Sequence, residues 1–512
     1  MMVRQSRYVL VLLLLLSVGC APARHDTNLV ARLPSILHKL DDTGAIVSAR
    51  VIELPSGREL FADDPDRPFT PASNMKLVVT AASLAALGPE HTFKTWLVGS
   101  GDDLVIVGSG DPAIGDPRIA QKARRTTETV LDEWAKVVQD KGYTWIAGDI
   151  CFDESYFEAR QIHPNWHEDD LVEWYACPVS GLNFNDNCID VSVQPGEAGK
   201  PVAYKVSPAT GTVDIVNSCL SGDKGDPVDV RRAPEHNIFT VTGTVTKAET
   251  LKSKPVTEPG LLIADAFRMA LERRGIRLDG TLRRVKVDRL ADGSPRGGKI
   301  LAVHESAMAD VMWRTNKSSQ NLFAECLAKT LGRRWAAQRG RDEPGSWANA
   351  APAIRAGIAK LGVSTRGLTV DDGSGLSDRN RVTARLLTDL LRAMFVHPYA
   401  EAFRASMARG GVDGTIEGRM SDLRGRIFAK TGYIGGVRTL SGYVRTKGGQ
   451  WLAFSFLYNR IDGTVKPYEK LQDDCCRVLV DWQSDSQAPE AATSSAPERP
   501  SPRHPAPHSR GT

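Results

Sequence analysis

The spacing of apolar residues differs from one segment of the chain to the next, and each spacing predicts a helix or a strand. Residues 45–53 and 59–61 read as two strands separated by a Pro-Ser-Gly turn, which predicts a β-hairpin. The apolar run 77–87 has the length of a helix, and Gly88-Pro89 is a typical helix stop. Near the other end of the chain, residues 468–482 have the spacing of an amphipathic helix that closes the core.

Short strand-like runs dominate the stretch from about 92 to 287. Examples are residues 103–107, 189–193 and 238–245. We interpret this stretch as a domain inserted into the first one, with a smaller β-rich module near 193–250 nested inside it. Helical patterns resume after the insertion.

The N-terminus has the features of a secretory signal. Arg4 and Arg7 precede the apolar run 8–16, which is too short for a comfortable transmembrane span. Gly19-Cys20 then resembles a bacterial lipobox, although Leu is more usual than Ser17 at its position. We therefore expect Cys20 to carry lipid and to anchor the protein to a membrane of the bacterial cell envelope, on the periplasmic side. The alternative is an ordinary signal peptide with a chance cysteine.

Composition limits the partners of the chain. Its 512 residues carry a formal net charge of +4, and removal of residues 1–19 with their two arginines lowers it to +2, which argues against a nucleic-acid partner. His304-Glu305 lacks the second histidine of H-E-x-x-H, and we expect neither a metal nor a cofactor.

The predicted organisation is a signal peptide (1–19), a lipid anchor and linker (20–40), a first catalytic part (41–91), the insertion (92–287), a second catalytic part (288–484) and a Pro-, Ala- and Ser-rich disordered tail (485–512).

Seven further cysteines follow Cys20, so pairing in an oxidising compartment would leave at least one of them free. Spacing alone does not fix the connectivity. A bridge between Cys188 and Cys219, which both flank strand-like runs of the insertion, is one guess.

The first chemical motif, Ser73-Asn74-Met75-Lys76, stands at the start of the predicted helix 77–87. Free backbone N–H groups and the helix dipole favour negative charge there, and Lys76 lies one turn after Ser73 on the same face. A serine hydroxyl is a poor nucleophile until a base takes its proton, and a lysine of lowered pKa can be that base. Taken alone, the motif is more simply a helix cap with a solvated lysine.

Two further motifs are Ser319-Gln320-Asn321 and Lys430-Thr431-Gly432. The first lies in a polar turn between two predicted helices, where a hydroxyl can relay a proton and an amide can hold Lys76. The second lies on the first strand of a meander that continues through 437–445 and 450–458, where its Lys and Thr can bind a carboxylate and its Gly permits close approach. Taken alone, the first motif is equally well explained as a Ser/Asn helix cap. The second is equally well explained as a solvated lysine on an edge strand.

S-x-x-K, S-x-N and K-T-G in this order are the signature of serine enzymes that react with penicillin. From about Asp41 to Trp482 the chain resembles the low-molecular-mass class C penicillin-binding proteins, the DacB-type D-alanyl-D-alanine carboxypeptidase/endopeptidases of bacterial cell walls. The long interval between the first two motifs resembles the inserted domains of that family. Further matching segments are Val107–Pro112, Cys177–Asn183, Asn316–Glu325, Asp372–Ser377 and Gly411–Thr415.

The resemblance implies an α+β fold. A penicillin-binding/β-lactamase-like transpeptidase domain, with an antiparallel sheet flanked by helices, would carry the large inserted mixed or β-rich domain. The implied reaction is acyl transfer on peptidoglycan stem peptides ending in D-Ala-D-Ala, with β-lactams as covalent inhibitors.

The resemblance also implies a role for each motif residue. Ser73 would be the nucleophile and Lys76 the general base, while Ser319 and Asn321 would transfer protons and place the lysine. The residues implied to bind substrate are Lys430, Thr431, Gly432 and Tyr433, with the backbone N–H groups of Ser73 and Tyr433 as the oxyanion hole.

One loop departs from the family pattern. In relatives that process diaminopimelate-type walls, an Arg directly follows D-G-S-G-L-S, whereas here Asp378 takes that place and Arg379 comes one residue later. Asn185 lies near the place where some relatives carry a substrate-binding Asp. We expect Arg379 to contact the wall peptide, but the side-chain preference stays open.

Two other functions remain as alternatives. A β-lactamase of the same fold is disfavoured because no acidic residue is placed to drive fast deacylation, and because the long insertion favours a wall enzyme. An inactive wall-binding or β-lactam-sensing lipoprotein is disfavoured because all reactive positions are intact. The chain contains no G-x-S-x-G, which disfavours an α/β-hydrolase.

Overall fold

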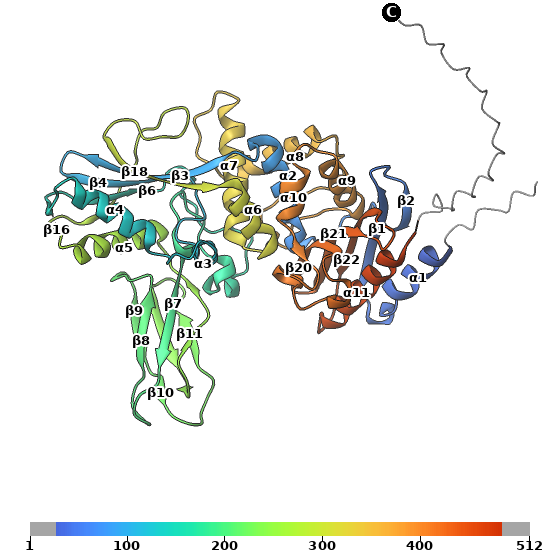
Figure 1. The fold of residues 1–512 in the computed structure, drawn as a ribbon, viewed down its shortest axis with the longest axis horizontal. Coiled ribbons are helices and arrows are strands. Elements are labelled where there is room, and N and C mark those ends of the chain that lie inside the picture. The colour runs from blue at the N-terminus through green and yellow to red at the C-terminus, as the bar shows by residue number, and fades with distance from the viewer. Residues whose placement is uncertain (1–26, 484–512) are drawn as a thin grey trace, which may run out of the picture.

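The computed structural model describes residues 27–483 and shows an elongated molecule (Figure 1). The main domain forms one end, a second sheet forms the other, and a β-rich module projects from the second sheet. The predicted signal peptide, Cys20 and the predicted disordered tail lie outside the described residues. Within 27–483, no helix combines the length and the apolar character that a membrane span requires.

A six-stranded antiparallel sheet, in the order β19-β20-β21-β22-β1-β2, forms the centre of the main domain. The predicted hairpin and meander are both confirmed as parts of it. β1 joins them because it pairs with β22 along its whole length, from Ile46↔Asn459 to Leu54↔Trp451. The strands are β1 (Ile46–Leu54), β2 (Glu59–Asp63), β19 (Ala408–Arg409), β20 (Ile427–Ile434), β21 (Val437–Arg445) and β22 (Trp451–Asn459).

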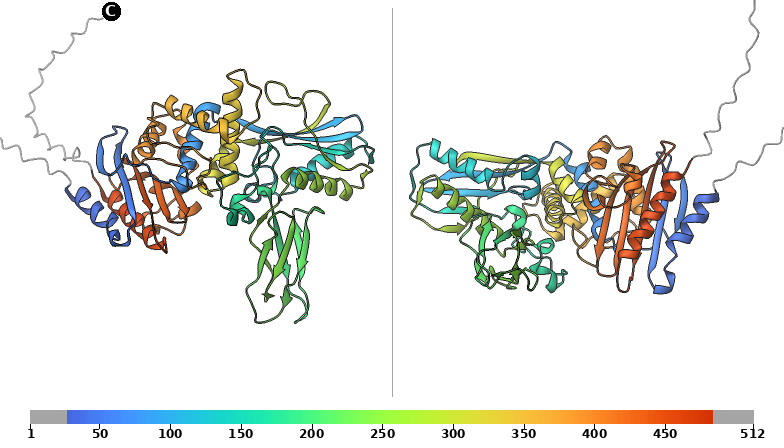
Figure 2. Two further views of the ribbon diagram at one scale, coloured as in Figure 1. Left: turned by 180° about the vertical axis from the view of Figure 1, so that it is seen from behind. Right: turned by 60° about the horizontal axis from the view of Figure 1, so that its bottom comes forward.

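Helices cover both faces of this sheet (Figure 2). α1 (Thr27–Leu37) and α11 (Lys466–Asp481) pack on one face, and α2 (Met75–Leu87), α8 (Trp347–Lys360) and α9 (Ala384–Phe395) occupy the other. α1 lies inside the stretch that the sequence assigned to an anchor and linker. Leu33 and Leu37 of this helix are buried against α11 and the sheet, so the main core already begins there.

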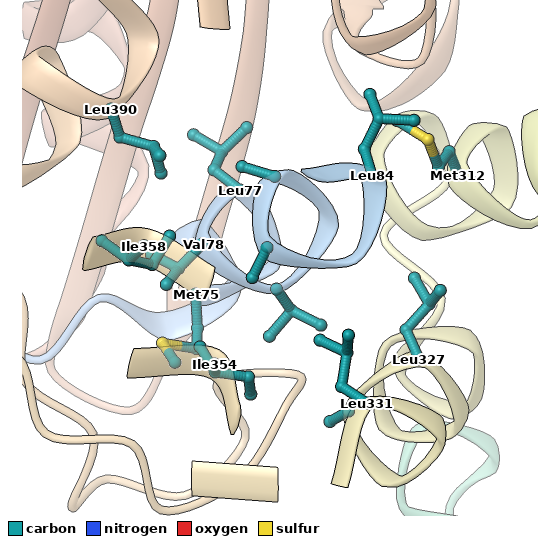
Figure 3. Close-up of a cluster of buried hydrophobic side chains, with 14 of the residues drawn as sticks. Met75, Leu77, Val78, Leu84, Met312, Leu327, Leu331, Ile354, Ile358 and Leu390 are labelled. Atoms are coloured by element: carbon teal, nitrogen blue, oxygen red, sulfur yellow. The ribbon is translucent and has the colours of Figure 1, made fainter. Parts of the chain in front are cut away.

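α2 is buried on all sides, and this explains why residues 77–87 are apolar almost throughout. Around it lie α6 (Met308–Lys317), α7 (Asn321–Ala337), α8 and α9. Figure 3 shows Met75, Leu77, Val78 and Leu84 of α2 among Met312, Leu327, Leu331, Ile354, Ile358 and Leu390. Burial of one such side chain contributes roughly 1.5–3 kcal/mol to the free energy of folding. The packing of several of them therefore holds the N-terminal turn of α2 in place. The short helix α10 (Ala400–Ala405) follows α9.

The insertion contains a five-stranded mixed sheet in the order β17-β6-β4-β3-β18. β3 leaves the main domain and β18 returns to it, and the two pair side by side, so the sheet extends beyond residue 287. Its elements are β3 (Thr92–Ser100), β4 (Asp103–Gly108), β6 (Ile150–Asp153), β17 (Leu282–Arg284) and β18 (Lys299–Ala307), with α3 (Pro117–Lys122), α4 (Thr129–Asp140), α5 (Pro259–Arg273) and the pair β5 (Trp145–Ile146) and β16 (Arg277–Leu278).

The nested module is built of short strands and projects away from the second sheet (Figure 1). The predicted strand 238–245 is interrupted at Gly243, which has a φ of +103°. The strands are β7 (Cys188–Gln194), β8 (Ala203–Ser207), β9 (Asp214–Asn217), β10 (Leu220–Ser221), β11 (Asp229–Arg232), β12 (Ile238–Thr242), β13 (Thr244–Val245), β14 (Glu249–Thr250) and β15 (Lys254–Pro255).

The guessed bridge between Cys188 and Cys219 is wrong, because both thiols are free and buried. Cys188 begins β7, whereas Cys219 accepts a hydrogen bond from Val202 N, next to the residue that pairs with the end of β7. Six residues of extended strand span about 20 Å, far more than a disulfide can bridge.

Candidate active site

The S-x-x-K serine lies in a three-residue 3-10 turn, Ala72–Asn74, directly before α2. Asn74 Nδ2 donates to Ser441 Oγ of β21 at 2.9 Å, which fastens the turn to the sheet. Ala72 has a φ of +45°, and a Cβ at Gly375 would lie 1.9 Å from its carbonyl oxygen. Only a glycine at 375 permits this close approach, so the D-G-S-G-L-S loop closes the other side of the turn.

Lys76 is fully buried and connects the first two motifs. Its Nζ lies 2.9 Å from Ser73 Oγ, 2.6 Å from Asn321 Oδ1 and 2.7 Å from the carbonyl oxygen of Ser374. Burial lowers the pKa of Lys76 to about 7, against the opposing effect of Asp372 and Glu325. A large fraction of the amine is therefore neutral near neutral pH and can accept a proton.

The S-x-N motif occupies the predicted turn between α6 and α7. Ser319 adopts a φ of +60° there, and Gln320 Oε1 accepts a hydrogen bond from Asn321 N at 2.9 Å. The amide of Asn321 is oriented from two sides, because its Nδ2 donates to the carbonyl of Tyr175 at 2.7 Å while its Oδ1 accepts from Lys76. Only the amide oxygen can therefore face the lysine.

The K-T-G motif completes the site from β20, directly after the two residues of that strand that pair with β19. Lys430 is fully buried, and its Nζ donates to Ser319 Oγ at 2.8 Å. Thr431 Oγ1 donates to Thr415 Oγ1 at 2.9 Å. A Cβ at Gly432 would lie 3.1 Å from Ser73 N, so the strand passes directly beside the nucleophile turn. Tyr433, the next residue, is 59% exposed.

The pKa of Lys430 is lowered well below its usual range by burial, and further by the nearby Lys76 and Arg438. A carboxylate bound beside Lys430 would raise that pKa again, because an opposite charge favours the protonated amine. Lys430 is thus suited to an anionic ligand.

Two residues named from the sequence do not join this cluster. Arg379 is exposed; its backbone N–H donates to Ser377 Oγ at 3.2 Å, and its side chain makes no hydrogen bond within residues 27–483. Asn185 is buried, and its Nδ2 donates to the carbonyl of Cys188 at 2.8 Å. Asn185 therefore holds the start of β7, and within residues 27–483 its side chain makes no hydrogen bond to a motif residue.

Sequence reasoning missed three contacts in the site, those of the Ser374 and Tyr175 carbonyls and of the Thr415 hydroxyl. The carbonyl contacts use backbone atoms, for which residue type carries no signal. The segments that contain Ser374 and Thr415 did match the family, but without a contact attached to either residue.

Comparison with known proteins gives the same family as the motifs do. A family model described as the D-Ala-D-Ala carboxypeptidase 3 (S13) family matches residues 29–475. The D-alanyl-D-alanine carboxypeptidase of Actinomadura sp. is 31% identical over 93% of this chain and 89% of that protein. DacB of Haemophilus influenzae is 26% identical over 75% of this chain and 79% of that protein.

A solved structure shares the fold. The crystal structure of penicillin binding protein 4 (dacB) from Haemophilus influenzae superposes with a TM-score of 0.71 at 20% identity, over 88% of this chain and 100% of that chain. The predicted α+β fold with an inserted domain is thereby confirmed. Because the family model matches residues 29–475 and a relative is 31% identical over 93% of the chain, the chain belongs to the S13 family of D-Ala-D-Ala carboxypeptidases.

Proposed function

We propose that Ser73 is the nucleophile of this enzyme and Lys76 its general base. The chain is a serine-type D-Ala-D-Ala carboxypeptidase that acts on peptidoglycan peptides through an acyl-enzyme and binds β-lactams. The observation that carries the residue assignment is the fully buried Lys76 amine at 2.9 Å from Ser73 Oγ. This is the geometry of a nucleophile beside its base.

The proposed acylation begins when Ser73 Oγ attacks the carbonyl of the penultimate D-Ala and Lys76 Nζ takes its proton. The backbone N–H groups of Ser73 and Tyr433 bind the oxyanion that forms. Gly432 supports this pairing, because its lack of a side chain lets the backbone before Tyr433 approach Ser73 N closely. The proton then passes to the nitrogen of the leaving D-alanine.

Ser319 is the proposed relay for that proton. Its hydroxyl lies 2.8 Å from Lys430 Nζ, and Lys430 with Thr431 is proposed to bind the terminal carboxylate of the substrate. The leaving nitrogen is attached to the same residue as this carboxylate, so it would lie close to Ser319. Water then hydrolyses the acyl ester and restores Ser73.

A β-lactamase remains disfavoured on structural grounds. The two carboxylates that act on Lys76, Glu325 and Asp372, are buried and accept hydrogen bonds from backbone N–H groups. Neither is free to activate a water against the acyl ester. An inactive wall-binding or β-lactam-sensing protein is disfavoured because hydrogen bonds join the three motifs, from Lys76 to Asn321 and from Lys430 to Ser319.

Purified protein assayed on defined muropeptides tests this function. We expect D-alanine to be released from monomeric peptides that end in D-Ala-D-Ala, and the products from cross-linked dimers give the endopeptidase share. Steady multiple turnover of penicillin without release of D-alanine from peptides would instead indicate a β-lactamase.

Arg379 is proposed to contact the acidic end of the wall peptide, since its exposed guanidinium belongs to the loop that adjoins the nucleophile turn. Arg379→Ala should raise KM for a diaminopimelate-containing peptide by roughly 10- to 150-fold, the effect of losing a charge-assisted contact of about 1.5–3 kcal/mol. A lysine-containing peptide is the control substrate. Equal changes in KM for both peptides would contradict the contact.

The N-terminal signal supports a proposed location in the periplasm, with Cys20 as a lipid anchor. Gly19-Cys20 ends the signal-like run, so we expect cleavage before Cys20, a lipidated N-terminus and fractionation with membranes. Mass spectrometry of the mature N-terminus measures this directly. Cleavage at another bond would exclude the anchor, and Cys20→Ser should release the protein into the soluble periplasmic fraction.

A further inference from the structure

Two buried carboxylates accept hydrogen bonds from the backbone of the D-G-S-G-L-S loop, one from α7 and one from the first residue of the loop itself, and the reaction as described does not use them. Glu325 of α7 is one of them, and it is fully buried. Its Oε1 accepts from Ser374 N at 2.7 Å, its Oε2 accepts from Trp347 Nε1 at 2.8 Å, and Gly373 N donates to both oxygens, at 3.1 Å to Oε1 and 2.9 Å to Oε2. Within residues 27–483, all three groups that hydrogen-bond to it are N–H donors.

Asp372 is the second carboxylate, and it is 1% exposed. Its Oδ1 accepts from Gly375 N at 2.7 Å, and its Oδ2 accepts from Ser377 N at 2.7 Å and from Trp166 Nε1 at 2.9 Å. Four backbone N–H groups of the loop therefore point at one of the two carboxylates, those of Gly373, Ser374, Gly375 and Ser377.

These bonds determine where the Ser374 carbonyl points. In a trans peptide the C=O and the following N–H point in opposite directions. Because Gly375 N–H is directed to Asp372, the Ser374 oxygen is directed to the other side, where it lies 2.7 Å from Lys76 Nζ. Glu325 fixes the preceding peptide through Ser374 N in the same way.

The Ser374 carbonyl in turn determines the direction of the lysine lone pair. A neutral amine has two hydrogens and one lone pair, and Lys76 has three neighbours. The Ser374 carbonyl and Asn321 Oδ1 can only accept, so they take both hydrogens at 2.7 Å and 2.6 Å. The lone pair is left for the third neighbour, the hydroxyl of Ser73 at 2.9 Å.

We propose that Glu325 and Asp372 are positioning residues for the general base, because they hold the Ser374 carbonyl on Lys76 and so aim the amine at Ser73. This inference rests on the proposed role of Lys76. Both carboxylates also act on the amine through their charge.

Other charged groups face the same region. Lys329, one turn after Glu325 on α7, lies 3.4 Å from the centre of the Trp347 ring and 3.2 Å from Glu158 Oε1. Lys430 faces Lys76 from β20. Burial and the neighbouring Asp372 raise the pKa of Glu325, and the three N–H donors oppose that rise.

The test is the pH profile of Ser73 acylation by a D-Ala-D-Ala peptide or penicillin in the full-length protein. The wild-type rate should rise with pH through about 7, where Lys76 becomes neutral. Glu325→Gln removes a negative charge, so the pKa of Lys76 falls and the rise moves to lower pH. The rate above the rise should drop on the order of 10²-fold, the effect of a base displaced by about 1 Å, with KM unchanged.

Two variants separate charge from geometry and from folding. Glu325→Asp keeps the charge, so its rise should stay at the wild-type pH while its limiting rate falls. Glu158→Gln is the matched control, since it removes a carboxylate that accepts from Lys329 Nζ and Trp347 N but does not contact the loop. It should leave both the pH of the rise and the limiting rate unchanged.

An unshifted profile with a wild-type limiting rate in Glu325→Gln would overturn the proposal. If that variant does not fold, Trp347→Phe decides, because it removes one donor to Glu325 and leaves both charges. A lowered limiting rate at an unshifted pH is then expected, and a wild-type rate overturns the proposal. Failure of wild-type Ser73 to acylate at all would instead contradict the assignment of Ser73 and Lys76.

Discussion

Penicillin is expected to add one acyl group to the wild-type protein and none to Ser73→Ala. The β-lactam ring resembles the D-Ala-D-Ala amide, and three motifs converge on Ser73, with Lys76 Nζ at 2.9 Å from its hydroxyl. The adduct should persist, because Glu325 and Asp372 are buried and fully engaged by donors. Intact-mass measurement before and after incubation with penicillin detects it, and peptide mapping identifies the residue.

A matched control exists on the same helix. Ser83 of α2 is fully buried, and its hydroxyl has no hydrogen-bond partner within residues 27–483. Ser83→Ala should acylate at the wild-type rate and release D-alanine normally, whereas Ser73→Ala should lose both activities together. A penicillin adduct on Ser73→Ala, or no adduct on the wild type, would show that the nucleophile is elsewhere.

Lys76→Ala is expected to lower the acylation rate by about 10²–10⁴-fold, the usual contribution of a general base. Below a pH of about 7 the amine of the wild type is protonated and cannot accept the serine proton, so the wild-type rate rises as the pH passes through that value. The residual rate of Lys76→Ala should lack this rise. Stopped-flow acylation with a chromogenic β-lactam across the pH range measures both quantities.

Lys329 supplies the control for the loss of a buried lysine. It is also fully buried, and burial lowers its pKa to about 8, but it contacts Trp347 and Glu158 and not Ser73. Lys329→Met keeps most of the side-chain volume and should retain the rise with pH and most of the rate. An equal loss in both variants would mean that Lys76 acts by stabilising the fold rather than as the base.

Local patterns were sufficient for several elements of the catalytic domain. The hairpin of β1 and β2, the meander of β20 to β22 and helix α2 were predicted within a few residues of their bounds. Each of them is marked by an alternation of apolar and polar residues, by a turn residue or by a helix stop, and these signals lie within the element itself. The order of the three motifs carried the chemistry for the same reason, because each motif is short and contiguous.

Other features depended on contacts between distant segments. α1 lies where the sequence indicated a linker, and its place depends on the burial of Leu33 and Leu37 against α11, at the other end of the chain. β18 extends the inserted sheet past the predicted border because it pairs with β3. Cys188 and Cys219 flank strands in sequence, yet β7 separates them in space.

The catalytic site likewise has features that the sequence predicts and features that depend on contacts between distant segments. Residue types and order identified Ser73, Lys76, Ser319, Asn321 and Lys430 as candidates, since their chemistry belongs to the side chains. The direction of the Lys76 amine depends on the Ser374 carbonyl, and that carbonyl depends on Glu325 and Asp372. A backbone oxygen has the same chemistry in every residue, so only the folded chain, which brings α2, α7 and the D-G-S-G-L-S loop together, decided how the base is aimed.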